Sequence, residues 1–299
     1  MAWDITAISA YVSELEFELM SKVVLKTDLA NYVQTRVGLK GMTEKIPLLS
    51  GDFNLADGLA CGFDGSSNNT DITQVTMNLV SKKYQSELCS AELQSIFMGQ
   101  YLSAGQNGQQ EDVPFAELVA NYYVEKAANY VETFLTQGDG TVDGIEDLVQ
   151  VANGAVAQTT VTPAAWSSSN AIAQAQSLYE ALPAKSQNMN DLIMIVSPEY
   201  KRALALNITQ TNYFHISPDS DDVFVPGTNV RVVANAGLSG RNYACVGPAS
   251  AIIYGTDLTG DFEEFRIWYS QDNDTMRTQM RFKLGVAITE TDLFAENTL

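Results

Sequence analysis

Residues that commonly carry enzyme chemistry are few in this chain, and their spacing matches no catalytic pattern. His215 is the only histidine, so a Ser-His or Cys-His nucleophile pair has one candidate base. The chain contains no Gly-x-Ser-x-Gly elbow to meet it, no phosphate-binding Gly-x-x-x-x-Gly-Lys-Ser/Thr loop and no His-Glu-x-x-His helix. The sequence therefore predicts a protein that is not an enzyme and that uses no cofactor.

The nearest approach to a metal site is residues 139–144, which read DGTVDG and resemble the start of a calcium-binding EF-hand loop. Such a loop needs an acidic or amide side chain at its third position and a bidentate glutamate at its twelfth. Here these positions hold Thr141 and Gln150. We interpret the segment as a polar turn that ends a helix, and we expect no bound metal.

The cysteines and the first residues of the chain indicate where the protein is made. Cys61, Cys89 and Cys245 are odd in number and scattered, which predicts buried free thiols rather than disulfides or a zinc module. Residues 1–20 have neither the basic start nor the continuous apolar run of a secretory signal. No stretch approaches the roughly 20 apolar residues of a membrane span. We expect synthesis in the cytoplasm and no membrane partner.

The clearest element is a helix over residues 114–137. Pro114 suits the first turn, Glu117 favours the positive end of the helix dipole, and Gly138 and Gly140 stop the helix. At 1.5 Å per residue it extends about 35 Å. Its expected buried face comprises Phe115, Leu118, Tyr122, Tyr123, Ala127, Tyr130, Val131 and Phe134.

Strand patterns lie on both sides of this helix. Residues 46–53 and 74–80 predict a hairpin, with a loose tip at 62–71 that is rich in turn-forming residues. Residues 192–196 predict a buried strand, and Ser197-Pro198 opens the helix that follows it. Short strands are expected at 230–234, 243–246 and 251–254. The strongest alternation, at 264–286, predicts a long closing hairpin with one buried face.

The N-terminal segment shows helical spacing of apolar residues, with acids on its other faces. The apolar residues are Ile8, Tyr11, Val12, Leu15 and Leu19, and the acids are Glu14, Glu16 and Glu18. An amphipathic helix of this kind needs a surface to lie against, either on its own body or on a neighbour.

The chain is large enough to bury a substantial core, and its charge is strongly acidic. It has 299 residues, 45% of them hydrophobic, and a formal net charge of -19. Lys126 is the only basic residue from Tyr84 to Ala184, a stretch with twelve acids, whereas five bases lie in the first 45 residues. A basic arm on an acidic body favours head-to-tail attraction between copies, although acidity also simply promotes solubility.

The order of these elements resembles the major capsid proteins of tailed phages, which have the Hong Kong 97-type fold. The most specific segments are 192–200 (LIMIVSPEY) and the closing hairpin from 265 to 291. The resemblance implies an α+β fold with an N-terminal arm at 1–45, an E-loop hairpin at 46–90, a P domain with its spine helix at 91–138, an A domain at 139–260 and closing P-domain strands at 261–299. Residues 41–47 (GMTEKIP) and 61–63 (CGF) are similar to shell proteins of crAss-like and related Bacteroidetes phages.

What the resemblance implies is self-assembly into pentamers and hexamers that form an icosahedral head shell around the genome. The expected location is the virion, after assembly in the host bacterial cytoplasm. Expected partners are further copies of the chain, portal, scaffold or decoration proteins, and loosely held double-stranded DNA. Expected assembly contacts are Lys22, Lys26, Arg36 and Lys40 in the arm, and Phe63, Val75, Met77 and Leu79 in the hairpin.

Two alternatives remain at this point. An encapsulin-type compartment shares the fold but encloses an enzyme, and the basic arm favours the phage interpretation over it. An acidic enzyme or binding domain needs a convergent polar site, for which the sequence offers no candidate.

Overall fold

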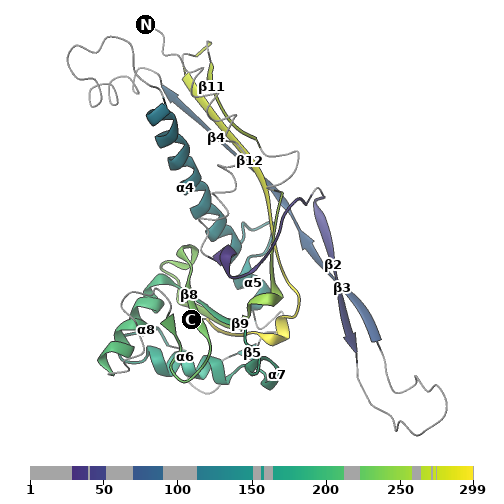
Figure 1. Cartoon of the computed structure of the whole chain (residues 1–299), viewed down its shortest axis with the longest axis vertical. Helices are drawn as coiled ribbons and strands as arrows, with labels where there is room; N and C mark the ends of the chain where they lie inside the picture. Colours follow the sequence, from purple (N-terminus) through teal and green to yellow (C-terminus); the bar gives the residue numbers. More distant parts are fainter. Residues whose placement is uncertain are drawn as a thin grey trace, which may run out of the picture.

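The longest helix lies alongside the longest strand, and together they form the axis of an elongated molecule (Figure 1). Helix α4 spans Val113–Gln137 and strand β12 spans Thr275–Ile288. This computed structural model describes residues 29–39, 41–51, 70–89, 113–150, 156–157, 164–211, 223–257, 264–270, 272–273 and 275–298. The amphipathic segment 8–19 and residues 62–69 of the hairpin tip lie outside the described residues, whereas Thr70 and Asp71, which were expected in the tip, belong to a strand.

Helix α4 has the predicted bounds to within one residue, and it buries only part of the predicted face. Tyr123, Ala127, Val131 and Phe134 are buried in one cluster with apolar residues of β12. Tyr122 and Tyr130, which were expected on the same face, are 54% and 42% exposed. The apolar stripe is therefore narrower than the spacing suggested, and it leaves aromatic rings on the surface.

Strand β12 organises a long sheet because it is paired along both edges. Strands β11 (Glu264–Ser270) and β4 (Val80–Cys89) both run antiparallel to its first half. Strand β10 (Ile252–Thr256) pairs with its second half, and β1 (Gln34–Arg36) runs parallel to β10. Strand β4 was not anticipated, because its lysines, serines and glutamate show no apolar alternation.

A second hairpin projects away from this sheet (Figure 1). Strands β2 (Thr43–Gly51) and β3 (Thr70–Asn78) pair antiparallel, and Leu79 joins β3 to β4. The observed strands begin three and four residues earlier than the predicted ones, which started at 46 and 74. The base of the hairpin packs on the long sheet through Ile46, Met77 and Leu79, which are buried with Ile253 and Ala287.

Two glycines allow the backbone of the β2–β3 hairpin to cross the long sheet at close range. Gly255 of β10 and Gly285 of β12 lie directly opposite each other, under the base of the hairpin. A Cβ atom at Gly285 would lie 2.6 Å from the backbone oxygen of Asn78, closer than real Cβ contacts allow. A Cβ atom at Gly255 would meet only side-chain ends, those of Met77 at 2.5 Å and Leu39 at 2.9 Å. The hairpin backbone thus rests where the sheet has no side chains.

A compact lobe forms the other end of the molecule, around a six-stranded sheet with strand order β5-β13-β9-β6-β8-β7. Its helices α6 and α8 pack on one apolar cluster of this sheet. The predicted cap is confirmed: the Ser197 hydroxyl accepts a hydrogen bond from the Tyr200 backbone N–H at 3.3 Å. Helix α5 (Ile145–Val149) follows α4 and is buried in the same apolar cluster as α4 and β12. The bounds within the lobe are β5 (Val156–Ala157), α6 (Ala171–Glu180), α7 (Ala184–Gln187), β6 (Leu192–Val196), α8 (Pro198–Gln210), β7 (Val223–Phe224), β8 (Arg231–Ala234), β9 (Tyr243–Pro248) and β13 (Ala295–Thr298).

Several expectations agree with this fold, and the domain limits stay a prediction. The mixed helix and sheet architecture, the closing hairpin and the buried strand at 192–196 are confirmed. Strand β4, which the sequence assigned to the E-loop segment, pairs along β12 as part of the long sheet. Within the described residues, no helix combines the length and apolar character needed to cross a membrane.

Replacing each glycine with alanine tests whether the close approach of the hairpin to the sheet constrains the fold. Gly285→Ala should lower the free energy of unfolding by about 1–3 kcal/mol, because backbone must move to accept the methyl group. Gly255→Ala should cost clearly less, because the ends of the Met77 and Leu39 side chains can move aside whereas backbone cannot. Chemical denaturation of both variants measures the difference, and equal stabilities would show that the close approach does not constrain the fold.

Candidate assembly surfaces

The candidates for enzyme chemistry and metal binding were His215 and the cysteines. His215 and Cys61 lie outside the described residues. Among the residues that are described, no group of three or more His, Cys, Asp or Glu side chains is placed to hold a metal ion.

The EF-hand-like segment forms a turn whose aspartate is fully engaged. The Asp139 Oδ1 atom accepts hydrogen bonds from the backbone N–H groups of Thr141 and Val142, at 2.9 and 3.0 Å. The Asp139 Oδ2 atom forms an ion pair with Lys82 of β4. Gly138, with a φ of 69°, ends α4 in the left-handed conformation that glycine adopts easily. The segment therefore ends the helix and ties it to the long sheet, as the interpretation as a turn predicted.

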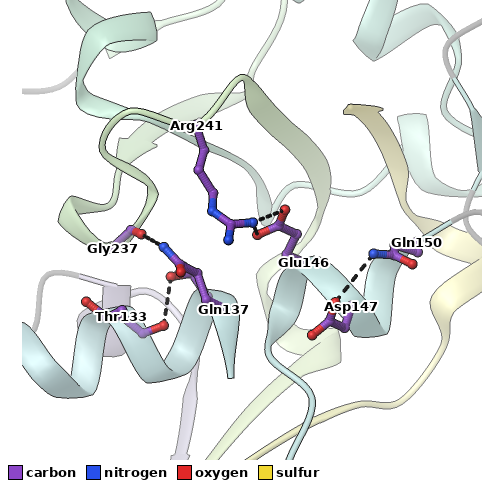
Figure 2. A network of polar contacts seen from close by, with 8 residues as sticks. Thr133, Gln137, Glu146, Asp147, Gln150, Gly237 and Arg241 are labelled. Atoms are coloured by element: carbon purple, nitrogen blue, oxygen red, sulfur yellow. Dashed lines mark hydrogen bonds and ion pairs between the residues drawn. The ribbon is translucent and has the colours of Figure 1, made fainter. Parts of the chain in front are cut away.

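A polar network joins the end of α4 to the compact lobe (Figure 2). Arg241 Nη1 donates to both carboxylate oxygens of Glu146, at 2.7 and 2.8 Å. Gln137 Nε2 donates to the backbone oxygen of Gly237. Surface ion pairs contribute only about 0–1 kcal/mol each. These contacts therefore connect the lobe to the end of the helix while adding little to overall stability.

The two described thiols differ in environment. Cys245 is buried in β9, and loss of solvation raises the pKa of its thiol to about 12. The prediction of a buried thiol is wrong for Cys89, which is exposed near the end of β4. Its neighbours in this strand alternate between the two faces of the sheet, and Cys89 falls on the open one.

The hairpin carries an exposed apolar pair far from its base. Leu49 of β2 and Ile72 of β3 are directly paired across the strands, and they are 75% and 70% exposed. These are the two most exposed large apolar side chains of the described residues. Paired apolar side chains left in water typically mark an interaction surface. Leu49 was included in a predicted strand, whereas Ile72 fell just after the expected tip, so their pairing was not visible in the sequence.

The structure places the eight expected assembly contacts in different environments. Lys22, Lys26, Lys40 and Phe63 lie outside the described residues. Arg36 is half-buried in β1, and Val75 is half-buried in β3. Met77 and Leu79 are already covered by this chain's own core, with 0% and 3% of their surfaces exposed. The role of the eight residues in assembly stays a prediction.

Comparison with known proteins gives structural matches only. No protein-family model matches the sequence, and no curated protein matches it. Solved structures match over nearly the whole chain. A chain of the capsid of an empty GTA particle has a TM-score of 0.59 at 12% identity, covering 90% of this chain and 88% of its own length.

Two phage structures give similar values. A chain of the procapsid of satellite phage P4, solved with its size determination protein, has a TM-score of 0.59 at 10% identity, covering 94% of this chain and 90% of that one. A chain of the capsid of Myoviridae phage XM1 has a TM-score of 0.53 at 11% identity, with coverages of 91% and 92%. The chain therefore has the fold of tailed-phage and GTA capsids, as the Hong Kong 97-type resemblance predicted.

The contrast between the thiols is directly testable. In a Cys61→Ala background, a disulfide reagent at pH 8 should modify Cys89 quickly and Cys245 only after denaturation. A pKa near 12 instead of 9.0 reduces the thiolate fraction roughly a thousandfold, and burial adds a steric barrier. Two rapidly modified thiols in the native protein would contradict the described packing of β9.

Proposed function

We propose that this chain is the major shell protein of a tailed-phage head, and that its copies form pentamers and hexamers of an icosahedral container. The observation that carries the proposal is the capsid fold over about nine-tenths of the chain. The elongated axis and projecting hairpin support it, because they extend side chains well beyond the lobe.

Assembly in this proposal depends on many moderate contacts rather than one strong site. When one surface of a subunit meets a different surface of the next copy, the ring closes if the rotation is right. A projecting hairpin adds a second attachment to the same neighbour, which raises the effective affinity without a new type of contact. The Leu49 and Ile72 pair supplies apolar area for this attachment, and Arg36 and Val75 remain candidate contacts near the base.

The finer parts of the proposal concern partners and origin. The chain is a virion component assembled in a bacterial cytoplasm, with portal, scaffold or decoration proteins as partners. Its net charge of -19 disfavours tight contact with packaged DNA, so the genome is held loosely. The short resemblances at 41–47 and 61–63 support an origin among crAss-like or related phages.

Electron microscopy of the purified protein tests the proposal. We expect closed shells or ring-shaped capsomers, alone or on co-expression with the other head proteins of its phage. A stable monomer under both conditions would overturn the shell assignment. Mass spectrometry of the particle contents separates the alternatives, since an enclosed enzyme would indicate an encapsulin-type compartment.

The exposed hairpin pair gives a sharper prediction. Leu49→Ser combined with Ile72→Ser should leave the subunit folded, because both side chains are largely exposed in the single chain. Shell yield should fall at least tenfold, because apolar area meant for a neighbour is lost. Thermal melting checks the fold and microscopy counts the particles.

Leu206→Ser is the matched control, since Leu206 is 49% exposed on α8 and lies on the compact lobe. A normal shell yield from the double variant would exclude the pair as an attachment point. An unfolded double variant would instead show that the distal hairpin stabilises the subunit itself.

A further inference from the structure

A cavity of about 310 Å³ opens between α4, β4 and β12. Its lining combines tyrosines and apolar side chains with three lysines. The lining residues are Lys82, Lys83, Tyr84, Tyr123, Lys126, Ala127, Tyr130, Met280 and Phe282. At about 30 Å³ per water molecule, the cavity has room for roughly ten waters, or for two or three side chains.

Two of the three lysines that line the cavity lack an acidic partner within the described part of the chain. Lys82 is paired with Asp139, whereas Lys83 and Lys126 form no ion pair among the described residues. Lys126 lies only over the ring of Tyr122, with 5.6 Å from Nζ to the ring centroid. The chain has 36 acids for 17 bases, so partners are plentiful. Two lysines without an acidic partner beside the cavity, Lys83 and Lys126, therefore offer a binding place for a carboxylate from outside the described residues.

Aromatic rings are exposed around the same opening. Tyr84, Tyr122 and Tyr130 are 46%, 54% and 42% exposed, and they belong to the few large apolar side chains on the described surface. Tyr84 contacts Tyr123, and Tyr130 contacts Phe282, with ring centroids 5.8 and 6.4 Å apart. Tyrosine is enriched where proteins bind one another, and a concave apolar centre offers a place for an inserted side chain, while the lysines add positive charge.

The chemistry of the cavity favours an acidic amphipathic helix over nucleic acid. A DNA backbone needs a row of cations along a groove, and it gains nothing from a small apolar hollow. The N-terminal segment of this chain has the complementary pattern: Asp4, Glu14, Glu16 and Glu18 are its charged side chains before Lys22. Glu14 and Glu18 are four residues apart, so they lie on one side of a helix beside its apolar stripe.

We propose that residues 8–19 dock as a helix into this lysine and tyrosine cavity of their own chain. Side chains of the apolar stripe, such as Tyr11 and Leu15, enter the cavity, while Glu14 and Glu18 pair with Lys83 and Lys126. The inference goes beyond shell formation, because it concerns the single subunit.

The length of chain available permits this docking. The described chain begins at Leu29 in the short helix η1 (Leu29–Asn31), which is buried in the same apolar cluster as α4. The ten residues from 19 to 29 reach about 33 Å when extended, and α4 itself, with 25 residues, is about 37 Å long. A short tether gives a millimolar effective concentration, which favours the segment of the same chain over that of a second copy.

Hydrogen exchange on the full chain, as a dilute unassembled subunit, tests the proposal. Amides of residues 8–19 should exchange at least tenfold more slowly than in an unstructured peptide. Lys83→Glu with Lys126→Glu should abolish this protection. Adding Glu14→Lys and Glu18→Lys to that variant should restore it, because each proposed charge pair is then reversed.

Lys185→Glu with Lys201→Glu makes the same change in net charge on the compact lobe and should leave the protection intact. Amides of β6 monitor the fold, and Lys83→Gln with Lys126→Gln is a milder substitute should the reversal unfold the chain. Unchanged exchange after reversal, or equal loss in the control, would overturn the docking. If these amides were protected only at concentrations where copies associate, the cavity would bind the segment of a neighbouring copy instead. If the charge reversal removed only the binding of duplex DNA, the cavity would be a phosphate-binding site instead. The result is independent of whether shells form.

Discussion

The structure depends on the pairing of β12 along both of its edges. Its first half lies between β11 and β4, and its second half carries β10, so this single strand connects the closing segment with segments from the first third of the chain. Its side chains from Phe282 to Ile288 are nearly all buried. A strand buried in this way has one favourable register, because a shift by one residue would move each side chain to the opposite face.

The hairpin and helix take their positions from this strand. Gly285 leaves space in β12 for the backbone of β3, so the hairpin crosses the sheet at one point and projects from there. The ion pair of Lys82 with Asp139 connects the end of α4 to β4, which is itself paired with β12. Arg241 and Glu146 then relate the compact lobe to the same helix end (Figure 2). A rigid axis with fixed attachments suits a subunit whose outer parts must meet neighbours at defined angles.

The surface combines strong acidity with a few concentrated apolar sites. Net charge of this size keeps separate copies apart at low salt, whereas a Debye length near 8 Å at physiological salt confines the repulsion to close contacts. Apolar pairs such as Leu49 and Ile72 can then decide where copies meet. The cavity lined by lysines and tyrosines beside α4 combines positive charge with an apolar hollow.

The sequence alone determined the elements whose signals are local. The span of α4, its end at Gly138 and the cap at Ser197 follow from residues that satisfy or terminate helical hydrogen bonds within a few positions. The alternation in β12 and the order of elements also sufficed for the fold class.

Tertiary structure decided what depends on distant partners. Strand β4 exists because β12 supplies its hydrogen bonds, not because its polar sequence favours a strand. Met77 is buried and Ile72 exposed, although both are apolar residues of β3, because Met77 lies at the base of the hairpin on the face toward the sheet, whereas Ile72 lies farther out on the opposite face. Periodicity reports which side chains share a face, and only packing determines whether anything covers that face.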